Sequence, residues 1–327
     1  MHTLLGLSSI VLVTLGSYLT LGMLHRVGPW SQRRDVQCFV LAVPILSLVL
    51  GLGGLHHFSG RPCLSRAPSW DGLLGVALPL AMGLIALGAL GLGMVRLALM
   101  RRVVIRSGVS ADSDLQALAD ALAERLGIVR FRLLLCASDR PLALTYGLFR
   151  PTVLLSTWMV KHLDRRELEA VLAHELEHVA RRDYLVIWLA TVLRDAFFYV
   201  PASRAAYRQL QHEKELACDD STVGATQRPL ALASALTKVW LHAVERPPYA
   251  RLSPAQPLVG VDEVITGRIE RLLASPHPVT TTLHARTASL RLGIGALAGI
   301  LVLEAVNVAL ILAAMGCGPL LLLGKLF

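Results

Sequence analysis

Long apolar runs alternate with polar segments along this chain, and the runs carry almost no charged residues. Each run meets or approaches the ~20 residues that a helix needs to cross the roughly 30 Å hydrocarbon core of a bilayer. The pattern therefore predicts a bundle of four transmembrane helices. They are residues 3–24, 38–55, 70–97 and 292–323, the last of which is interrupted by Glu304.

The residues that flank these runs predict how the chain is oriented in the membrane. The first run has no basic segment before it and no clear cleavage site after it, so we interpret it as a retained span rather than a signal peptide. Basic residues in short loops favour the cytoplasmic side. The loops after the first and third runs are basic, although Arg61 and Arg66 in the second loop weaken the contrast. We therefore predict an outer N-terminus.

This orientation divides the chain into three parts. Residues 1–100 hold three spans, residues 101–287 form a cytoplasmic domain, and residues 288–327 hold the fourth span and a short tail. In the last span, Glu304 and Asn307 lie one helical turn apart. A carboxyl group at that depth is costly, so it either has a function or is a protonated group hydrogen-bonded within the bundle.

The predicted cytoplasmic domain begins with a helix followed by strands. Leucines spaced by three and four residues predict an amphipathic helix over residues 110–126. Residues 129–136 alternate between apolar and basic side chains, which indicates a strand. Residues 148–156 predict a second strand, and Pro151 confines it to a sheet edge or to its first residues. Such a strand either pairs with an extended substrate at its free edge or only supports the helix that follows.

Two helices are predicted after these strands. Asp164 and Glu167 have the spacing of a capping box, which predicts a helix from Arg165 through His178. Residues 184–200 are apolar, but they are few for a span and contain Arg194 and Asp195 near the middle. We therefore predict a helix packed in the domain or lying on the bilayer surface, with a fifth span as the alternative.

Composition agrees with a membrane protein. Hydrophobic residues make up 54% of the 327 positions and charged residues 17%, with a mean hydropathy of +0.57, which excludes an ordinary soluble protein. The net charge of +9 lies largely at membrane flanks, where basic residues attract anionic lipid, so direct binding of nucleic acid is not expected. The five cysteines are scattered, which indicates neither a disulfide framework nor a cysteine zinc site.

A His-Glu-x-x-His motif lies inside the helix predicted after Asp164. His174 and His178 are four residues apart, so both imidazoles project from one helical face and suit two ligands of one zinc ion. Glu175 is adjacent to that face, where a carboxylate can take a proton from a metal-polarised water molecule. Because the chain has 11 histidines, a chance match is possible, and the interpretation depends on a third ligand.

A third ligand is expected in the acidic segment of residues 211–220. Glu215 and Asp219 share a helical face, so they can supply a metal-binding carboxylate and a second carboxylate that accepts the free N–H of a ligand histidine. His212 and Glu213 are local rivals, and a solvated acidic face is the alternative without a metal. Cys218 is interpreted as a small packing residue.

The two motifs together resemble the membrane antirepressor peptidases of β-lactam signalling, the BlaR/MecR type. The resemblance covers roughly residues 1–315 and rests on residues 174–183 and 213–220, with weaker similarity at residues 147–156 and 268–273. It implies that Glu175 is the general base, that zinc is bound by three residues, and that Asp219 orients a ligand. The implied zinc ligands are His174, His178 and Glu215, and the implied oxyanion contact is Arg268 or His277.

The resemblance also sets expectations for the whole protein. It implies a helical membrane bundle that bears a cytoplasmic α+β, zincin-like (gluzincin) metallopeptidase domain in the bacterial inner membrane. The expected substrates are polypeptides, with a transcriptional repressor or the chain itself among the candidates. Because the sequence ends at Phe327, a few residues after the last run, we expect no penicillin-binding sensor domain.

Two other functions remain open from the sequence. One is a membrane zinc protease for quality control or processing. The other belongs to a different class, a non-catalytic receptor or adaptor whose zinc site is structural.

Overall fold

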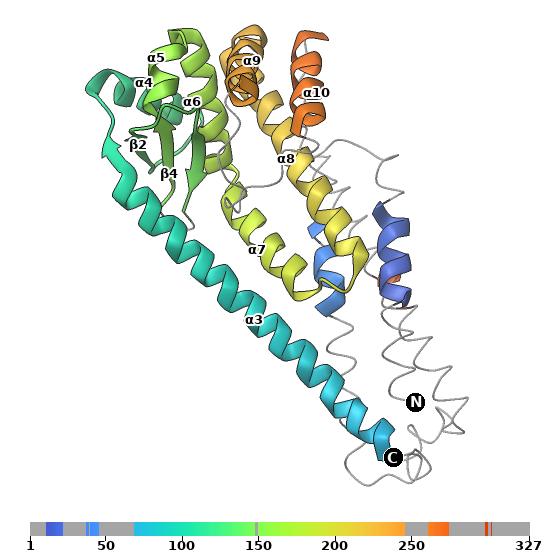
Figure 1. Ribbon diagram of the computed structural model, residues 1–327. Helices are drawn as coiled ribbons and strands as arrows, with labels where there is room; N and C mark the ends of the chain where they lie inside the picture. Colours follow the sequence, from blue (N-terminus) through green and yellow to red (C-terminus); the bar gives the residue numbers. More distant parts are fainter. Residues whose placement is uncertain are drawn as a thin grey trace. The chain divides into compact units, whose positions relative to one another are not determined.

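The computed structural model of the protein is mostly helical, with one small sheet (Figure 1). It describes residues 11–21, 37–38, 40–45, 69–147, 150–245, 261–274, 298–299 and 302. Two compact units are present. One comprises residues 1–94, 189–210 and 282–327, and the other comprises residues 95–188 and 211–281.

The longest apolar helix begins in the first unit and ends in the second. Helix α3 (Ser69–Ser107) has 39 residues, and its part Leu80–Ser107 is long and apolar enough to cross a membrane. It is the only such helix among the described residues, where Val11–Leu21 is a shorter apolar helix. The predicted fourth span, Glu304 included, lies almost entirely outside the described residues. One membrane-capable helix is therefore present, and the four-span bundle stays a prediction.

The apolar segment after the motif helix forms one helix and the turn that follows it. Helix α7 (Asp183–Ala196) has 14 residues, fewer than the ~20 of a typical span, and helix α8 (Pro201–Thr226) begins five residues later. The turn between them packs Phe197 and Val200 into a buried apolar cluster of the first unit. The predicted helix over residues 184–200 is therefore confirmed as a helix, but it ends at Ala196.

A four-stranded sheet forms the frame of the second unit, in the order β1-β2-β4-β3. Strands β2 and β4 run parallel, and both outer pairs are antiparallel. The strands are β1 (Gly108–Ser110), β2 (Arg132–Cys136), β3 (Ala143–Tyr146) and β4 (Thr152–Ser156). The predicted strands at residues 129–136 and 148–156 are confirmed as β2 and β4. Of the two alternatives left open for this strand, a free edge is excluded, because β4 lies between β2 and β3, and Pro151 comes directly before its first residue.

Helices cover both faces of this sheet, which explains why its strands have buried residues on each side. Leu133, Val153 and Leu155 pack with helices α4 (Ser113–Arg125), α5 (Thr157–His162) and α6 (Arg165–Ala180). On the other face, Cys136, Tyr146 and Leu154 pack against the end of α3 at Val104. Helices α9 (Pro229–Glu245) and α10 (Val261–Ala274) complete the unit.

Two turns in the second unit require glycine. Helix α4 is capped by Asp112, and Gly127 follows it with φ +68°. Gly147, directly after β3, has φ +111°, and a Cβ there would collide with the Arg150 carbonyl. A larger residue at this point would therefore displace the edge strand β3.

Candidate active site

Helix α6 begins at a complete capping box, which fixes its first turn. Asp164 accepts hydrogen bonds from the backbone N–H of Arg166 and Glu167, while the Glu167 carboxylate accepts one from the Asp164 backbone. Lys238 and Ser234 on α9 also donate to Glu167 at 2.6 Å each. The sequence prediction of this helix start is confirmed, and the contacts with α9 hold it in the core.

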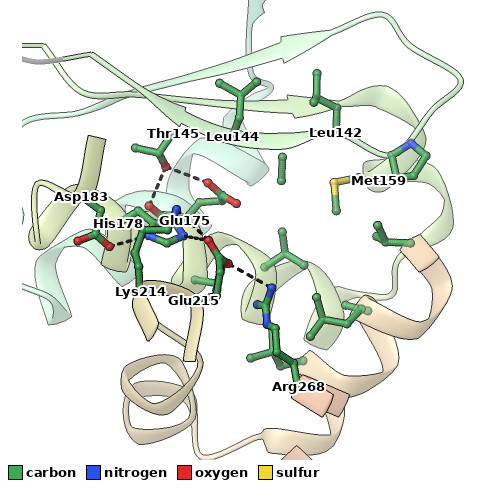
Figure 2. A pocket seen from close by; sticks show the side chains of 18 of the residues that line it. Leu142, Leu144, Thr145, Met159, Glu175, His178, Asp183, Lys214, Glu215 and Arg268 are labelled. Atoms are coloured by element: carbon green, nitrogen blue, oxygen red, sulfur yellow. Dashed lines mark hydrogen bonds and ion pairs between the residues drawn. The ribbon is translucent and has the colours of Figure 1, made fainter. Parts of the chain in front are cut away.

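Helices α6 and α8 bring the three predicted metal ligands together. His174 Nε2 lies 3.4 Å from one carboxylate oxygen of Glu215, and His178 Nε2 lies 3.8 Å from the other. The three donor atoms lie within 4.8 Å of one another. Figure 2 shows His178 and Glu215 facing each other across the site. Side chains 37 and 41 residues apart in sequence thus lie close together.

The second nitrogen of each histidine faces a buried carboxylate. His174 Nδ1 lies 3.2 Å from Asp219 Oδ1, and His178 Nδ1 lies 2.8 Å from Asp183 Oδ2. Asp219 was predicted in this position, whereas Asp183 was not. Asp183 starts α7 after Arg182, whose φ of 55° turns the chain at the end of α6. The motif is followed by the sequence Arg-Arg-Asp, and the acidic residue at its end is the signal from which Asp183 could have been predicted.

Arg268, one of the two predicted oxyanion contacts, is held by carboxylates. Its guanidinium group donates two 2.7 Å hydrogen bonds to Asp219 and lies 3.1 Å from Glu215. Arg268 therefore lies at the site. It contacts Glu215, a predicted ligand, and Asp219, the carboxylate that faces His174. His277, the other predicted contact, lies outside the described residues.

The local rivals for the third ligand are placed differently from Glu215. His212 is exposed and Glu213 is buried, and neither belongs to the potential metal-binding groups found among the described residues. Lys214, which the sequence did not suggest, lies 2.8 Å from Glu215 Oε1. Cys218 is buried 3.0 Å from His178 Nδ1, in the second such group, with His178 and Asp183.

The charges around the histidines favour a bound cation. Burial alone would lower the pKa of His174, but its contacts with Asp219 and Glu215 raise it to about 9. Burial opposes ionisation of Glu215, yet the His174 hydrogen bond and nearby positive charges hold its pKa well below the usual range. The group therefore attracts positive charge even though it is mostly buried.

The donor atoms also have the spacing that zinc requires. Two ligands ~2.1 Å from a zinc ion at the tetrahedral angle lie roughly 3.4 Å apart, close to the 3.4 and 3.8 Å found between the histidine nitrogens and Glu215. In addition, a carboxylate lies behind each imidazole, and the hydrogen bond between His178 Nδ1 and Asp183 leaves His178 Nε2 free to bind a metal. The residues present thus fit a zinc ion held by two histidines and one glutamate.

Glu175 is bordered by a cavity and by the edge strand β3. Its carboxylate Oε2 and its backbone oxygen each lie 2.9 Å from the Thr145 hydroxyl, as Figure 2 shows. The cavity, of about 460 Å³, is bounded by Glu175 and the metal-binding group on one side and by apolar side chains on another. The apolar wall includes Leu142, Met159, Val171, Leu236 and Val239.

Comparison with known proteins gives one family and several distant relatives. The family model described as BlaR1 peptidase M56 matches residues 69–255. A protease HtpX homolog of Streptomyces coelicolor is 35% identical over 27% of this chain and 40% of its own length. A protease HtpX homolog of Pyrobaculum calidifontis is 38% identical over 28% of this chain and 28% of its own length. The methicillin resistance mecR1 protein of Staphylococcus aureus is 28% identical over 25% of this chain and 14% of its own length. The chain thus spans less than half of these relatives.

Proposed function

Since the chain belongs to the BlaR1 peptidase M56 family, we propose that it is an integral-membrane zinc metalloendopeptidase that cleaves polypeptides at the cytoplasmic face of the membrane. One observation carries this proposal. His174, His178 and Glu215 converge with their donor atoms within 4.8 Å of one another, and Glu175 is the residue directly after His174 on the same helix.

Each residue of the site has a role that follows from its contacts. A bound zinc ion would polarise the scissile carbonyl group and the attacking water molecule. Glu175 accepts a proton from that water and delivers it to the nitrogen of the leaving amine. Asp219 and Asp183 orient the two histidines, and Arg268 balances the charge of Asp219. Lys214 keeps Glu215 ionised, which a metal ligand requires.

Strand β3 and the cavity beside it suit an extended polypeptide. Strand β3 is the outer strand next to the site, and an outer strand can hydrogen-bond to an added strand. Leu142 and Leu144 lie at the cavity that Glu175 borders. We infer that substrate backbone pairs with β3 while one apolar side chain enters the cavity.

The membrane placement and the biological role belong to the same proposal. The apolar helix segment Leu80–Ser107 supports attachment to the membrane, and the basic residues in its last two turns, Arg101, Arg102 and Arg106, support a cytoplasmic domain in a bacterial inner membrane. The resemblance to the BlaR/MecR type leads us to propose regulatory proteolysis, with a transcriptional repressor as a candidate substrate. The similarity to proteins named HtpX proteases supports proteolysis without indicating a substrate, and membrane quality control is the second candidate role.

The proposal is tested on the purified full chain with casein as the substrate. Glu175→Gln should keep one zinc ion per chain and lose cleavage, and a chelator should abolish cleavage by the wild type. Glu169→Gln is the matched control, because Glu169 lies on the same helix and pairs with Arg228 outside the site. Cleavage by Glu175→Gln would reject the enzyme mechanism, and zinc binding without hydrolysis by the wild type would favour the adaptor. Fragments that differ between cells with wild type and Glu175→Gln would then separate regulatory from quality-control substrates.

A further inference from the structure

Thr145 makes an unusual double contact with the general base. Its Oγ1 lies 2.9 Å from Glu175 Oε2 and also 2.9 Å from the backbone oxygen of Glu175. The two residues come from different elements, since Thr145 is on the edge strand β3 and Glu175 is on α6. Glu175 is only 8% exposed, so few water molecules can replace this contact.

The chemistry of a hydroxyl group gives this arrangement a specific meaning. A threonine hydroxyl has one proton to donate and two lone pairs that accept. When Glu175 is ionised, the hydroxyl donates to the carboxylate. When Glu175 carries a proton, the hydroxyl can donate to the Glu175 backbone oxygen instead and accept from the carboxyl group. A contact is thus available in both protonation states without movement of either backbone.

We propose that Thr145 is a positioning residue that holds the Glu175 carboxyl group in place throughout the catalytic cycle. The proposal rests on the proposed function. In that reaction a water O–H bond breaks, its proton moves to Glu175, and its oxygen bonds to the peptide carbon. The C–N bond then breaks and the proton moves to the amine nitrogen. The carboxyl group must stay aimed at the same place while it gains and loses this proton, and Thr145 keeps it there.

The position of Thr145 also connects the base with the substrate. Strand β3 is the strand that we infer to pair with the polypeptide, and the adjacent residue Leu144 lies at the cavity. A substrate aligned on β3 is therefore held by the same short strand that fixes the base. This arrangement sets the distance between the scissile bond and the carboxyl group through one rigid element.

The test compares two substitutions at one position. Thr145→Val keeps the shape of the side chain but removes the hydroxyl, and Thr145→Ser keeps the hydroxyl. In full-length protein with casein as the substrate, Thr145→Val should lower kcat roughly 10- to 100-fold, the range expected for a lost hydrogen bond to a charged group. KM and zinc content should stay close to those of the wild type. Thr145→Ser should restore most of kcat.

A matched control separates this effect from a general weakening of the sheet. Thr152 is a buried threonine of the neighbouring strand β4, and its hydroxyl contacts the Arg150 carbonyl away from the site. Thr152→Val should leave kcat unchanged. Wild-type kcat in Thr145→Val, or equal losses in the Val and Ser variants, would overturn the proposal. If Glu175→Gln is inactive, either result rejects the role of Thr145 but not the zinc peptidase mechanism. Failure of this proposal is therefore distinguishable from failure of the proposed function.

Discussion

Replacement of Arg268 by methionine tests whether the predicted metal site is also a buried charge cluster on which the domain depends. Arg268 and Asp219 are 8% and 2% exposed, and two 2.7 Å hydrogen bonds join them. Methionine keeps most of the apolar volume but leaves Asp219 without its guanidinium partner. Breaking a buried ion pair on one side costs about 3–5 kcal/mol, because the remaining charge stays buried.

This cost converts into a measurable shift of the melting temperature. For a domain of 150–250 residues, 1 kcal/mol corresponds to roughly 2–4 °C, so Arg268→Met should melt roughly 6–20 °C below the wild type. The measurement is thermal unfolding of the metal-free protein in detergent, followed by tryptophan fluorescence. Arg271→Met is the control on the same helix, since Arg271 pairs with Asp220 at 2.7 Å but its side chain is 36% exposed. An exposed pair contributes up to about 1 kcal/mol, so the control should melt within about 4 °C of the wild type.

A double substitution decides whether the loss comes from the Asp219 charge that has lost its guanidinium partner. When both partners of a buried pair are replaced by apolar groups, the result is often close to neutral. Arg268→Met combined with Asp219→Leu should therefore recover at least half of the lost melting temperature, although zinc should bind more weakly because His174 loses its carboxylate. The reasoning fails if Arg268→Met melts like the control, or if the double variant is less stable than the single one.

Two further predictions concern carboxylates that orient or stabilise α6. Asp183→Asn should weaken zinc binding roughly 10- to 100-fold, because it removes the charged acceptor behind His178. Competition with a chelator of known affinity measures the change, and an unchanged zinc affinity would contradict this role. Burial raises the pKa of Glu167, but Lys238 and Ser234 lower it more, and the resulting pKa lies below the ordinary value of 4.5. Its stabilising contribution is therefore present above that value and is lost as the pH falls through the folded-state pKa. The melting-temperature difference between wild type and Glu167→Gln should accordingly shrink between pH 7 and pH 3, and a constant difference would contradict the pairing.

Local patterns were sufficient to predict the helices that carry the ligands. The capping box at Asp164 and the four-residue spacing of His174 and His178 are properties of a single helix, and the structure has both. The same holds for Glu215 and Asp219 on α8. The residue of the segment 211–220 that faces the histidines is determined by tertiary packing, which spacing along one helix does not show. Glu215 was favoured there by the family resemblance.

The contacts that the sequence did not reveal all join separate elements. Asp183 reaches His178 only because the chain turns at Arg182, and Thr145 reaches Glu175 only because β3 lies beside α6. Strand β3 has four residues and follows a turn, so its short alternation of Leu144 and Tyr146 with smaller residues was not recognised. Pro151 was compatible with either an edge or a strand start, and only the pairing of β4 on both sides distinguishes them.

The arrangement of the site implies that metal binding and the packing of the domain are coupled. The histidines belong to α6, the carboxylates that face them belong to α7 and α8, and the arginine that balances Asp219 belongs to α10. A zinc ion held by His174, His178 and Glu215 would therefore draw together four helices, and the binding free energy would contribute to folding. Strand β3 supplies none of these charged side chains. Its Thr145 hydroxyl contacts the Glu175 carboxylate. The metal-binding group is thus separate from the strand that we infer to receive substrate, and the Thr145 hydroxyl connects the two through its contact with Glu175.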